Sequence, residues 1–179
     1  MNVSKTSVLI AGMGGQGVVS IAMILAESAA KIGCVTCLPE HGPEQRGGFS
    51  RCTLILSDEE VISPLPQKYH YMVVMDDASF GKHAKQLEPG GRMIVNADLV
   101  APAGKEAAGR LFIPADTMAA ELGSVRAANL VLLGALVGAG ALVPVELVKE
   151  EMAKRFAGKP EVLATNLAAF GKGLETGKK

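Results

Sequence analysis

A glycine-rich loop near the start of the sequence has the spacing of an anion-binding site. The segment Gly12-Met13-Gly14-Gly15-Gln16-Gly17 matches G-x-G-x-x-G and stands between an apolar run, residues 8–11, and an apolar helical stretch, residues 18–32. Glycines allow a tight turn and a close approach of the backbone to a ligand. The following helix adds unpaired N–H groups and a partial positive charge. The sequence therefore predicts a phosphate or pyrophosphate site at Gly12, Gly14, Gly15, Gln16 and Gly17.

Two other interpretations of this loop stay open. An NAD site would need an acidic side chain at the end of the second strand, and Glu40 is a candidate. His41, which follows it, is the best placed of the three histidines to transfer a proton in a dehydrogenase. Alternatively, the glycines serve only the tight packing of strand against helix and bind no ligand.

A second concentration of polar residues occupies residues 40–48. Arg46 precedes two glycines, Gly47 and Gly48, so the backbone can bend and present its guanidinium to a carboxylate or phosphate. In a doubly wound fold this loop would lie near the glycine loop, because it follows the carboxyl end of a strand. The alternative is a solvated surface loop in which Glu44 and Arg46 form a local ion pair worth about 0–1 kcal/mol.

The cysteines and the remaining histidines do not indicate a metal or redox centre. The sequence has three cysteines, too few for a four-thiolate iron–sulfur cluster. Cys34 and Cys37 are three positions apart on a predicted strand, which puts their thiols on opposite faces and favours small core residues over a redox or metal pair. His70 and His83 are predicted to be surface residues, and no His/Asp/Glu set has the spacing of metal ligands.

The elements that must position these loops alternate along the first two-thirds of the chain. Strands are expected at residues 8–11, 34–38, 49–56, 71–75, 93–95 and 111–113, with a turn at 88–91. Helices are expected at residues 18–32, 77–86, 117–122, 129–141, 146–156 and 162–173. This order predicts an α/β, Rossmann-like, doubly wound and mostly parallel sheet with a helical C-terminal third. We expect one domain over residues 1–174 and a polar, disordered tail at residues 175–179.

Composition excludes several classes of protein. Among 179 residues, 18 Lys plus Arg balance 18 Asp plus Glu and only 4% are aromatic, which argues against a nucleic-acid-binding protein. The longest apolar stretch, residues 130–143, is shorter than the roughly 20 residues of a membrane span. We interpret it as a buried helix at a packing or subunit interface. No targeting segment is evident, so a cytoplasmic location is expected.

Taken together, these motifs resemble those of a known family, the gamma subunits of 2-oxoacid:ferredoxin oxidoreductases, particularly the 2-oxoglutarate type. The matching segments occur in the family's order and cover nearly the whole chain. They are Gly12-Met13-Gly14-Gly15-Gln16-Gly17-Val18, Gly42-Pro43-Glu44-Gln45-Arg46-Gly47-Gly48, Ser63-Pro64, Leu87-Glu88-Pro89-Gly90-Gly91, Ile113-Pro114-Ala115, and Ala128-Asn129-Leu130-Val131-Leu132-Leu133-Gly134-Ala135.

The resemblance implies a multisubunit enzyme that oxidatively decarboxylates a 2-oxoacid with coenzyme A to acyl-CoA, CO2 and reduced ferredoxin. Thiamine diphosphate would lie between alpha and beta subunits, and iron–sulfur clusters would lie in other subunits, including a ferredoxin-like delta subunit. This chain has no Gly-Asp-Gly of the kind that binds thiamine diphosphate, in agreement with that division of labour. We therefore expect no catalytic residue, metal or covalently bound cofactor in it.

The resemblance also suggests what this chain contributes. The glycine loop could hold the nucleotide end of coenzyme A, with Arg46 as a second phosphate contact. Glu44, Gln45, Gly47, Gly48 and Asn129 are then interface or loop residues. The alternatives are an assembly module with an empty glycine loop, whose helices at 18–32 and 130–143 are docking surfaces, and a free-standing NAD-dependent dehydrogenase. Residues 40–48 are also similar to the indolepyruvate branch of the family, and pyruvate and branched-chain branches stay open.

Overall fold

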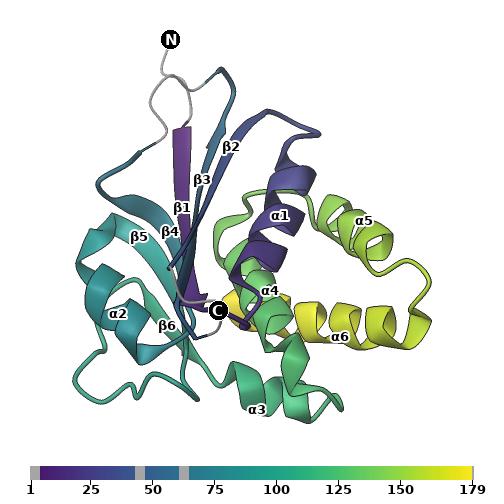
Figure 1. Cartoon of the computed structure of the whole chain (residues 1–179). Coiled ribbons are helices and arrows are strands. Elements are labelled where there is room, and N and C mark those ends of the chain that lie inside the picture. The colour runs from purple at the N-terminus through teal and green to yellow at the C-terminus, as the bar shows by residue number, and fades with distance from the viewer. Residues whose placement is uncertain (1–4, 43–46, 61–64, 179) are drawn as a thin grey trace.

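A computed structural model describes residues 5–42, 47–60 and 65–178. Within them, one mixed sheet has the strand order β2-β3-β1-β4-β5-β6 (Figure 1). The strands are β1 (Lys5–Met13), β2 (Cys34–His41), β3 (Phe49–Ser57), β4 (Tyr69–Val74), β5 (Leu87–Asn96) and β6 (Arg110–Ile113). Strands β1, β4, β5 and β6 are parallel, whereas β3 runs antiparallel to both β1 and β2. The predicted α/β class with a mostly parallel sheet is confirmed, and β2 with β3 adds an antiparallel hairpin at one edge.

Helices cover both faces of the sheet, but unequally. The helices are α1 (Val18–Ala29), α2 (Asp77–His83), α3 (Ala115–Ala120), α4 (Ala128–Gly140), α5 (Val145–Arg155) and α6 (Pro160–Gly177), with short 3-10 turns η1 (Ala84–Gln86) and η2 (Val125–Ala127). In Figure 1, α2 lies on one side of the sheet, and α1, α4, α5 and α6 lie on the other. The predicted helical C-terminal third is thus a thick layer over one face. None of the described helices is both long enough and apolar enough to cross a membrane.

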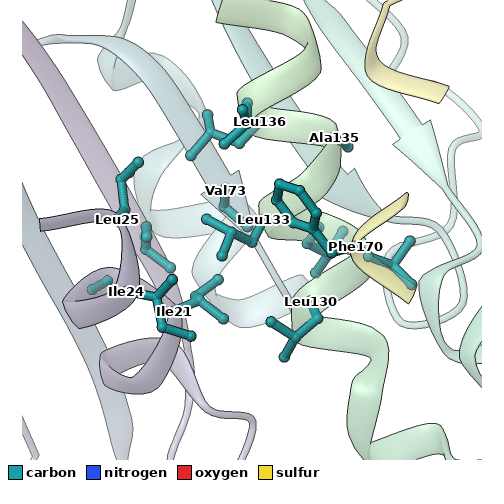
Figure 2. Packing of buried hydrophobic residues seen from close by; sticks show 14 of the residues in the cluster. Ile21, Ile24, Leu25, Val73, Leu130, Leu133, Ala135, Leu136 and Phe170 are labelled. Atoms are coloured by element: carbon teal, nitrogen blue, oxygen red, sulfur yellow. The ribbon is translucent and has the colours of Figure 1, made fainter. Parts of the chain in front are cut away.

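Alternation along β1 explains how one strand serves two cores. Val8 and Ile10 join the large cluster beneath α1, α4 and α6, whereas Leu9 and Ala11 join a smaller cluster beneath α2. Figure 2 shows the large cluster, in which Phe170 of α6 lies among side chains from α4, α1 and β4. The strand that leads into the glycine loop is therefore packed against a hydrophobic core on each face.

The apolar helices are covered by their own chain. Every residue of α4 from Leu130 to Val137 is buried, and the inward side of α1 is buried against the sheet. Residues 130–137 are therefore not an exposed docking surface, and the interpretation of this stretch as a buried helix is correct. The docking role of residues 18–32 stays a prediction, because the outer side of α1 is only partly buried and Ile32 is exposed.

Small residues let α4 and α6 cross at very short range. A Cβ at Gly173 would overlap the carbonyl oxygen of Val131, and a Cβ at Gly134 would overlap the carbonyl oxygen of Phe170. Gly177 meets the backbone of Ala135 in the same way. This crossing explains why the apolar stretch is rich in glycine although glycine is a poor helix former.

Several predicted boundaries differ from the structure. Residues 88–91, expected as a turn, belong to β5, where a register shift accompanies Gly90 at a φ of 82°. Helix α1 ends at Ala29 rather than at residue 32. Residues 175–177, expected as a disordered tail, continue α6, because Gly177 packs on Ala135 of α4.

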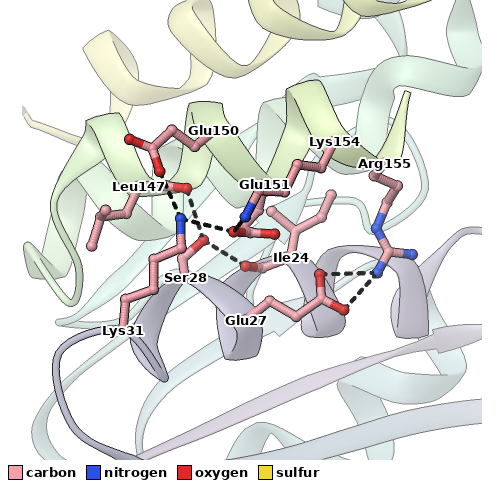
Figure 3. Close-up of polar contacts among 9 residues, drawn as sticks. All are labelled: Ile24, Glu27, Ser28, Lys31, Leu147, Glu150, Glu151, Lys154 and Arg155. Carbon is pink, nitrogen blue, oxygen red and sulfur yellow. Dashed lines mark hydrogen bonds and ion pairs between the residues drawn. The ribbon is translucent and has the colours of Figure 1, made fainter. Parts of the chain in front are cut away.

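Ion pairs join α5 to α1 and to the turn that follows it (Figure 3). The largely buried Glu151 carboxylate lies 2.8 Å from both Lys31 Nζ and Lys154 Nζ, and Lys31 also reaches Glu150 at 2.7 Å. Ser28 Oγ donates to the Leu147 carbonyl oxygen at 3.3 Å. The hydrogen bonds from Lys154 and Lys31 hold the pKa of Glu151 below its ordinary value of 4.5.

This arrangement predicts an acid-sensitive contribution to stability from Glu151. Since its pKa is lower in the folded chain than in the unfolded chain, the contribution is present above pH 4.5 and is lost as the pH falls through the folded pKa. Glu151→Gln should therefore destabilise the chain near neutral pH and lose that difference in acid, as measured by urea unfolding at a series of pH values. Glu175→Gln, which alters an exposed carboxylate on α6, is the control. A Glu151→Gln effect that is independent of pH would contradict the prediction.

Candidate functional site

The glycine loop turns between β1 and α1 through two left-handed glycines. Gly15 has a φ of 99°, and Gly17, at the N-cap of α1, has a φ of 81°. L side chains rarely adopt either conformation. Gln16 Oε1 accepts a hydrogen bond from the Met13 N–H at 2.6 Å, so the side chain braces the loop. Helix α1 has neither a side-chain cap nor an acidic residue in its first turn, which leaves its N-terminal dipole uncompensated.

The loop opens onto a pocket of about 560 Å³ at the carboxyl edge of the parallel strands. This edge is where open α/β sheets bind ligands, and the volume is in the usual range for small-molecule sites. The predicted residues that line the pocket are Gly15, Gln16, Gly17 and Asn129. The structure adds Asn96, Asp116 and Arg126 to them.

The remaining predicted glycines lie beside this pocket rather than in it. The Gly14 N–H donates to the carbonyl oxygen of Gly48 at 2.8 Å, so the two polar loops adjoin as predicted. Gly12 and Gly47 line a smaller pocket of about 130 Å³ on the α2 side of the sheet.

Three predicted residues of the second loop, Glu44, Gln45 and Arg46, lie outside the described residues. The role of Arg46 as a phosphate contact therefore stays a prediction.

The charges around the pocket are unequal. Arg126 is exposed at its wall and makes no ion pair within the described part of the chain. Asp116 accepts a hydrogen bond from Asn96 Nδ2 at 3.2 Å, and burial, with a smaller contribution from Asp98, raises the pKa of the Asp116 carboxyl above its ordinary value. Asn129 Oδ1 is buried without a hydrogen-bond partner among the described residues, whereas its Nδ2 lies against Gly17. A cation, free helix N–H groups and an unused acceptor thus surround one cavity.

The residues named for an NAD site do not form one. Glu40 accepts two hydrogen bonds from Arg51, at 2.9 Å from Nε and 2.7 Å from Nη2, which hold the pKa of Glu40 below its ordinary value. Strand β3 also separates β2 from β1, so the strand that carries Glu40 is not the neighbour of the glycine-loop strand as the dinucleotide fold requires. His41 lies 3.4 Å from Ser50 Oγ. Because both carboxylate oxygens of Glu40 are paired with Arg51, Glu40 is not available to bind a ribose.

The histidine predictions need one correction. His83 is buried, not at the surface, and its Nδ1 lies 2.6 Å from Gln86 Oε1. Burial lowers the pKa of its imidazole. No group of His, Cys, Asp and Glu side chains in the described ranges has the arrangement of a metal site.

Asn96, Asp116 and Arg126 were not among the predicted site residues. A signal existed for the first two, since Asn96 ends β5 and Asp116 follows β6, and parallel strands bring their carboxyl ends to one edge. Arg126 carries no such signal, because η2 reaches the pocket only through the packing of α3 and α4.

Comparison with known proteins agrees with the motifs. Residues 7–176 match the family model described as pyruvate ferredoxin/flavodoxin oxidoreductase. The chain is 34% identical to ketoisovalerate oxidoreductase subunit VorA of Methanothermobacter thermautotrophicus over 96% of its length, but it spans only 36% of that relative. It is 33% identical to the 2-oxoglutarate synthase subunit KorC of Archaeoglobus fulgidus, covering 98% of this chain and 89% of the relative.

Solved structures show the same relationship. The gamma subunit of a keto/oxoacid ferredoxin oxidoreductase from Geobacter sulfurreducens superimposes with a TM-score of 0.80 at 26% identity, covering 97% of this chain and 98% of that one. The 2-oxoglutarate:ferredoxin oxidoreductase of Magnetococcus marinus, solved with 2-oxoglutarate, coenzyme A and succinyl-CoA bound, gives a TM-score of 0.83 at 26% identity. This chain is covered to 97% and spans 31% of that longer chain. The chain described here therefore belongs to the pyruvate ferredoxin/flavodoxin oxidoreductase family, in which it corresponds to a gamma subunit.

Proposed function

We propose that this chain is the gamma subunit of an enzyme that oxidatively decarboxylates a 2-oxoacid with coenzyme A and yields an acyl-CoA, CO2 and reduced ferredoxin. Its proposed partners are the alpha and beta subunits and a ferredoxin-like delta subunit, in the cytoplasm. The family match over residues 7–176 supports this proposal. Thiamine diphosphate and iron–sulfur clusters belong to those partners in the proposal, and this chain supplies no catalytic residue.

The preferred substrate in this proposal is 2-oxoglutarate. Relatives named KorC match this chain along nearly their whole length, from 89% to 96% of it, as expected of a separate subunit. The VorA relatives are about as identical, at 33–34%, but this chain spans only 36–37% of their length. A branched-chain 2-oxoacid is the main competing substrate, and indolepyruvate and pyruvate are represented by more distant relatives.

The pocket at the glycine loop is the proposed site for the nucleotide end of coenzyme A. The observation that carries this assignment is that Arg126 lines the same cavity as Gly15 and Gly17. The N–H groups at the start of α1 and the Arg126 guanidinium would hold pyrophosphate oxygens. Burial raises the pKa of Asp116. Its carboxylate would repel an ionised phosphate, so we expect an uncharged part of the ligand at that wall of the pocket.

A contribution to assembly is also proposed, at a different surface. Met13 and Phe49 face each other across β1 and β3, and their exposed fractions are 42% and 44%. Lys82 Nζ lies 4.5 Å above the Phe49 ring. Exposed apolar side chains at the end of a sheet are suited to contact with a larger subunit.

Substitution of Arg126 tests the coenzyme A assignment. In the assembled enzyme, Arg126→Ala should raise the apparent KM for coenzyme A about ten- to hundredfold, because a charge-assisted hydrogen bond contributes about 1.5–3 kcal/mol. Arg92→Ala removes the same charge from an exposed position within β5 that does not line the pocket, and should leave KM unchanged. Equal KM values for both variants and the unaltered enzyme would refute the assignment. Loss of copurifying subunits would instead place Arg126 in an interface.

A further inference from the structure

Two cysteines from neighbouring strands meet inside the β2–β3 hairpin. The sequence draws attention to Cys34 and Cys37, but the structure pairs Cys37 with Cys52, with 3.3 Å between the two sulfur atoms. Pro39 is the register partner of Cys52, so Cys37 and Cys52 are diagonal neighbours on one face of the antiparallel pair. Cys34 is exposed and lies on the other face, as its offset of three predicted.

The two thiols of the pair differ in access to solvent. Cys52 is fully buried in the large core beneath α1, whereas Cys37 is only partly buried at its margin. Met23 Sδ of α1 lies 4.0 Å from Cys37 Sγ. A small oxidant can therefore reach Cys37 but not Cys52, and Cys52 can react only with a group already on Cys37.

The acid–base properties of the pair agree with this division. A hydrogen bond donated by the Cys52 thiol lowers the pKa of Cys37 to about 7, against the opposing effects of burial and of the Glu27 carboxylate. The same contact and burial raise the pKa of Cys52. The thiolate, which is the nucleophilic form, is therefore on Cys37, and the proton stays on Cys52.

We propose that Cys37 and Cys52 are a modification site, a thiol pair that hydrogen peroxide oxidises to an intrachain disulfide. The Cys37 thiolate attacks one peroxide oxygen, the O–O bond breaks, and the departing hydroxide takes a proton to become water, which leaves Cys37 as a sulfenic acid. The Cys52 sulfur then attacks the Cys37 sulfur, the S–O bond breaks, and the leaving hydroxide takes the Cys52 proton to give a second water. Overall, the two thiols lose one electron each to the peroxide.

The disulfide would link two strands at the edge of the sheet that lies nearest the glycine loop. It would tie the edge strand β2 to β3, and the tip of the same hairpin holds the Gly14 N–H through the Gly48 carbonyl oxygen. Strand β3, which carries Cys52, therefore connects the thiol pair to the glycine loop. The thiol chemistry itself does not depend on which ligand the loop binds.

Peptide mapping of the full chain tests the proposal. Trypsin places Cys34 and Cys37 in the fragment of residues 32–46 and Cys52 in the fragment of residues 52–68. After treatment of the folded, reduced chain with an equimolar amount of peroxide and alkylation of the remaining thiols, the two fragments should be joined, with the alkyl group on Cys34. The link should form at least about tenfold faster in the folded chain than in urea, because folding holds the sulfurs together.

Variants make the assignment specific. Cys34→Ser should form the same link at the same rate, whereas Cys37→Ser should form none and should leave Cys52 open to alkylation only after unfolding. Because the wild-type map is informative alone, a misfolded Cys37→Ser variant does not weaken the test. A link that carries Cys34, a link that persists in Cys37→Ser, or peroxide products confined to Cys34 would overturn the proposal.

Discussion

Replacing Gly173 with alanine is expected to lower the free energy of unfolding by about 3 kcal/mol or more. The added Cβ would overlap the Val131 carbonyl oxygen and would lie 3.0 Å from the Ala135 nitrogen, both on α4. These are backbone atoms inside a helix, so neither can move aside without separating α4 from α6. The separation would open the core around Phe170, which is fully buried beside the side chains of α4 (Figure 2).

The matched control for this substitution is two residues away on the same helix. No atom lies within 4 Å of a Cβ at Gly171, so Gly171→Ala should stabilise the chain by about 0.5–1 kcal/mol through helix propensity alone. Urea unfolding followed by circular dichroism measures both variants. If Gly173→Ala were as stable as Gly171→Ala, the close crossing of α4 and α6 would be wrong.

The second large effect is expected at the glycine loop. Gly17→Ala should lower the free energy of unfolding by about 2–4 kcal/mol, because it combines the strain of a left-handed alanine, about 1–2 kcal/mol, with overlap of Asn129. Gly15→Ala shares the left-handed conformation but has nothing within 4 Å of its Cβ, so it should cost only the strain. The difference between the two variants isolates the contact between the loop and α4.

A double-mutant cycle tests that contact directly. In an Asn129→Ala background, Gly17→Ala should lose its crowding component and cost no more than Gly15→Ala does. Additive costs would show that Asn129 does not shape the loop. Gly17→Ala should also weaken coenzyme A binding in the assembled enzyme more than Gly15→Ala does. The added Cβ would displace the Asn129 side chain, which lines the pocket.

Local patterns in the sequence predict most elements but not the direction of β3. Alternating strands and helices indicate an α/β sheet, yet a buried strand has the same composition whether it runs parallel or antiparallel. The missed signal was the connection between His41 and Phe49, which is too short for the crossover of a dozen or more residues that a parallel neighbour requires. The helical end of α6 was missed because residues 175–177 are held by contacts with α4 rather than by their own composition.

The candidate site was only half predictable for a similar reason. The glycine loop can be recognised from the sequence alone, because Gly15 and Gly17 belong to a local pattern with a known backbone geometry. Arg126 and Asp116 come from distant segments that converge only in the folded chain, so no spacing rule connects them to the loop. Glu40 fitted the dinucleotide pattern by position, but the hairpin gives it Arg51 as a partner.

Anaerobic purification of a tagged copy of this chain from its native host tests the central proposal most directly. Larger subunits should copurify, and the purified material should reduce a viologen dye only when a 2-oxoacid and coenzyme A are both present, fastest with 2-oxoglutarate. A complex that prefers 3-methyl-2-oxobutanoate (ketoisovalerate) would change the substrate but keep the role. A chain that purifies alone, without partners and without 2-oxoacid-dependent activity, would contradict the account.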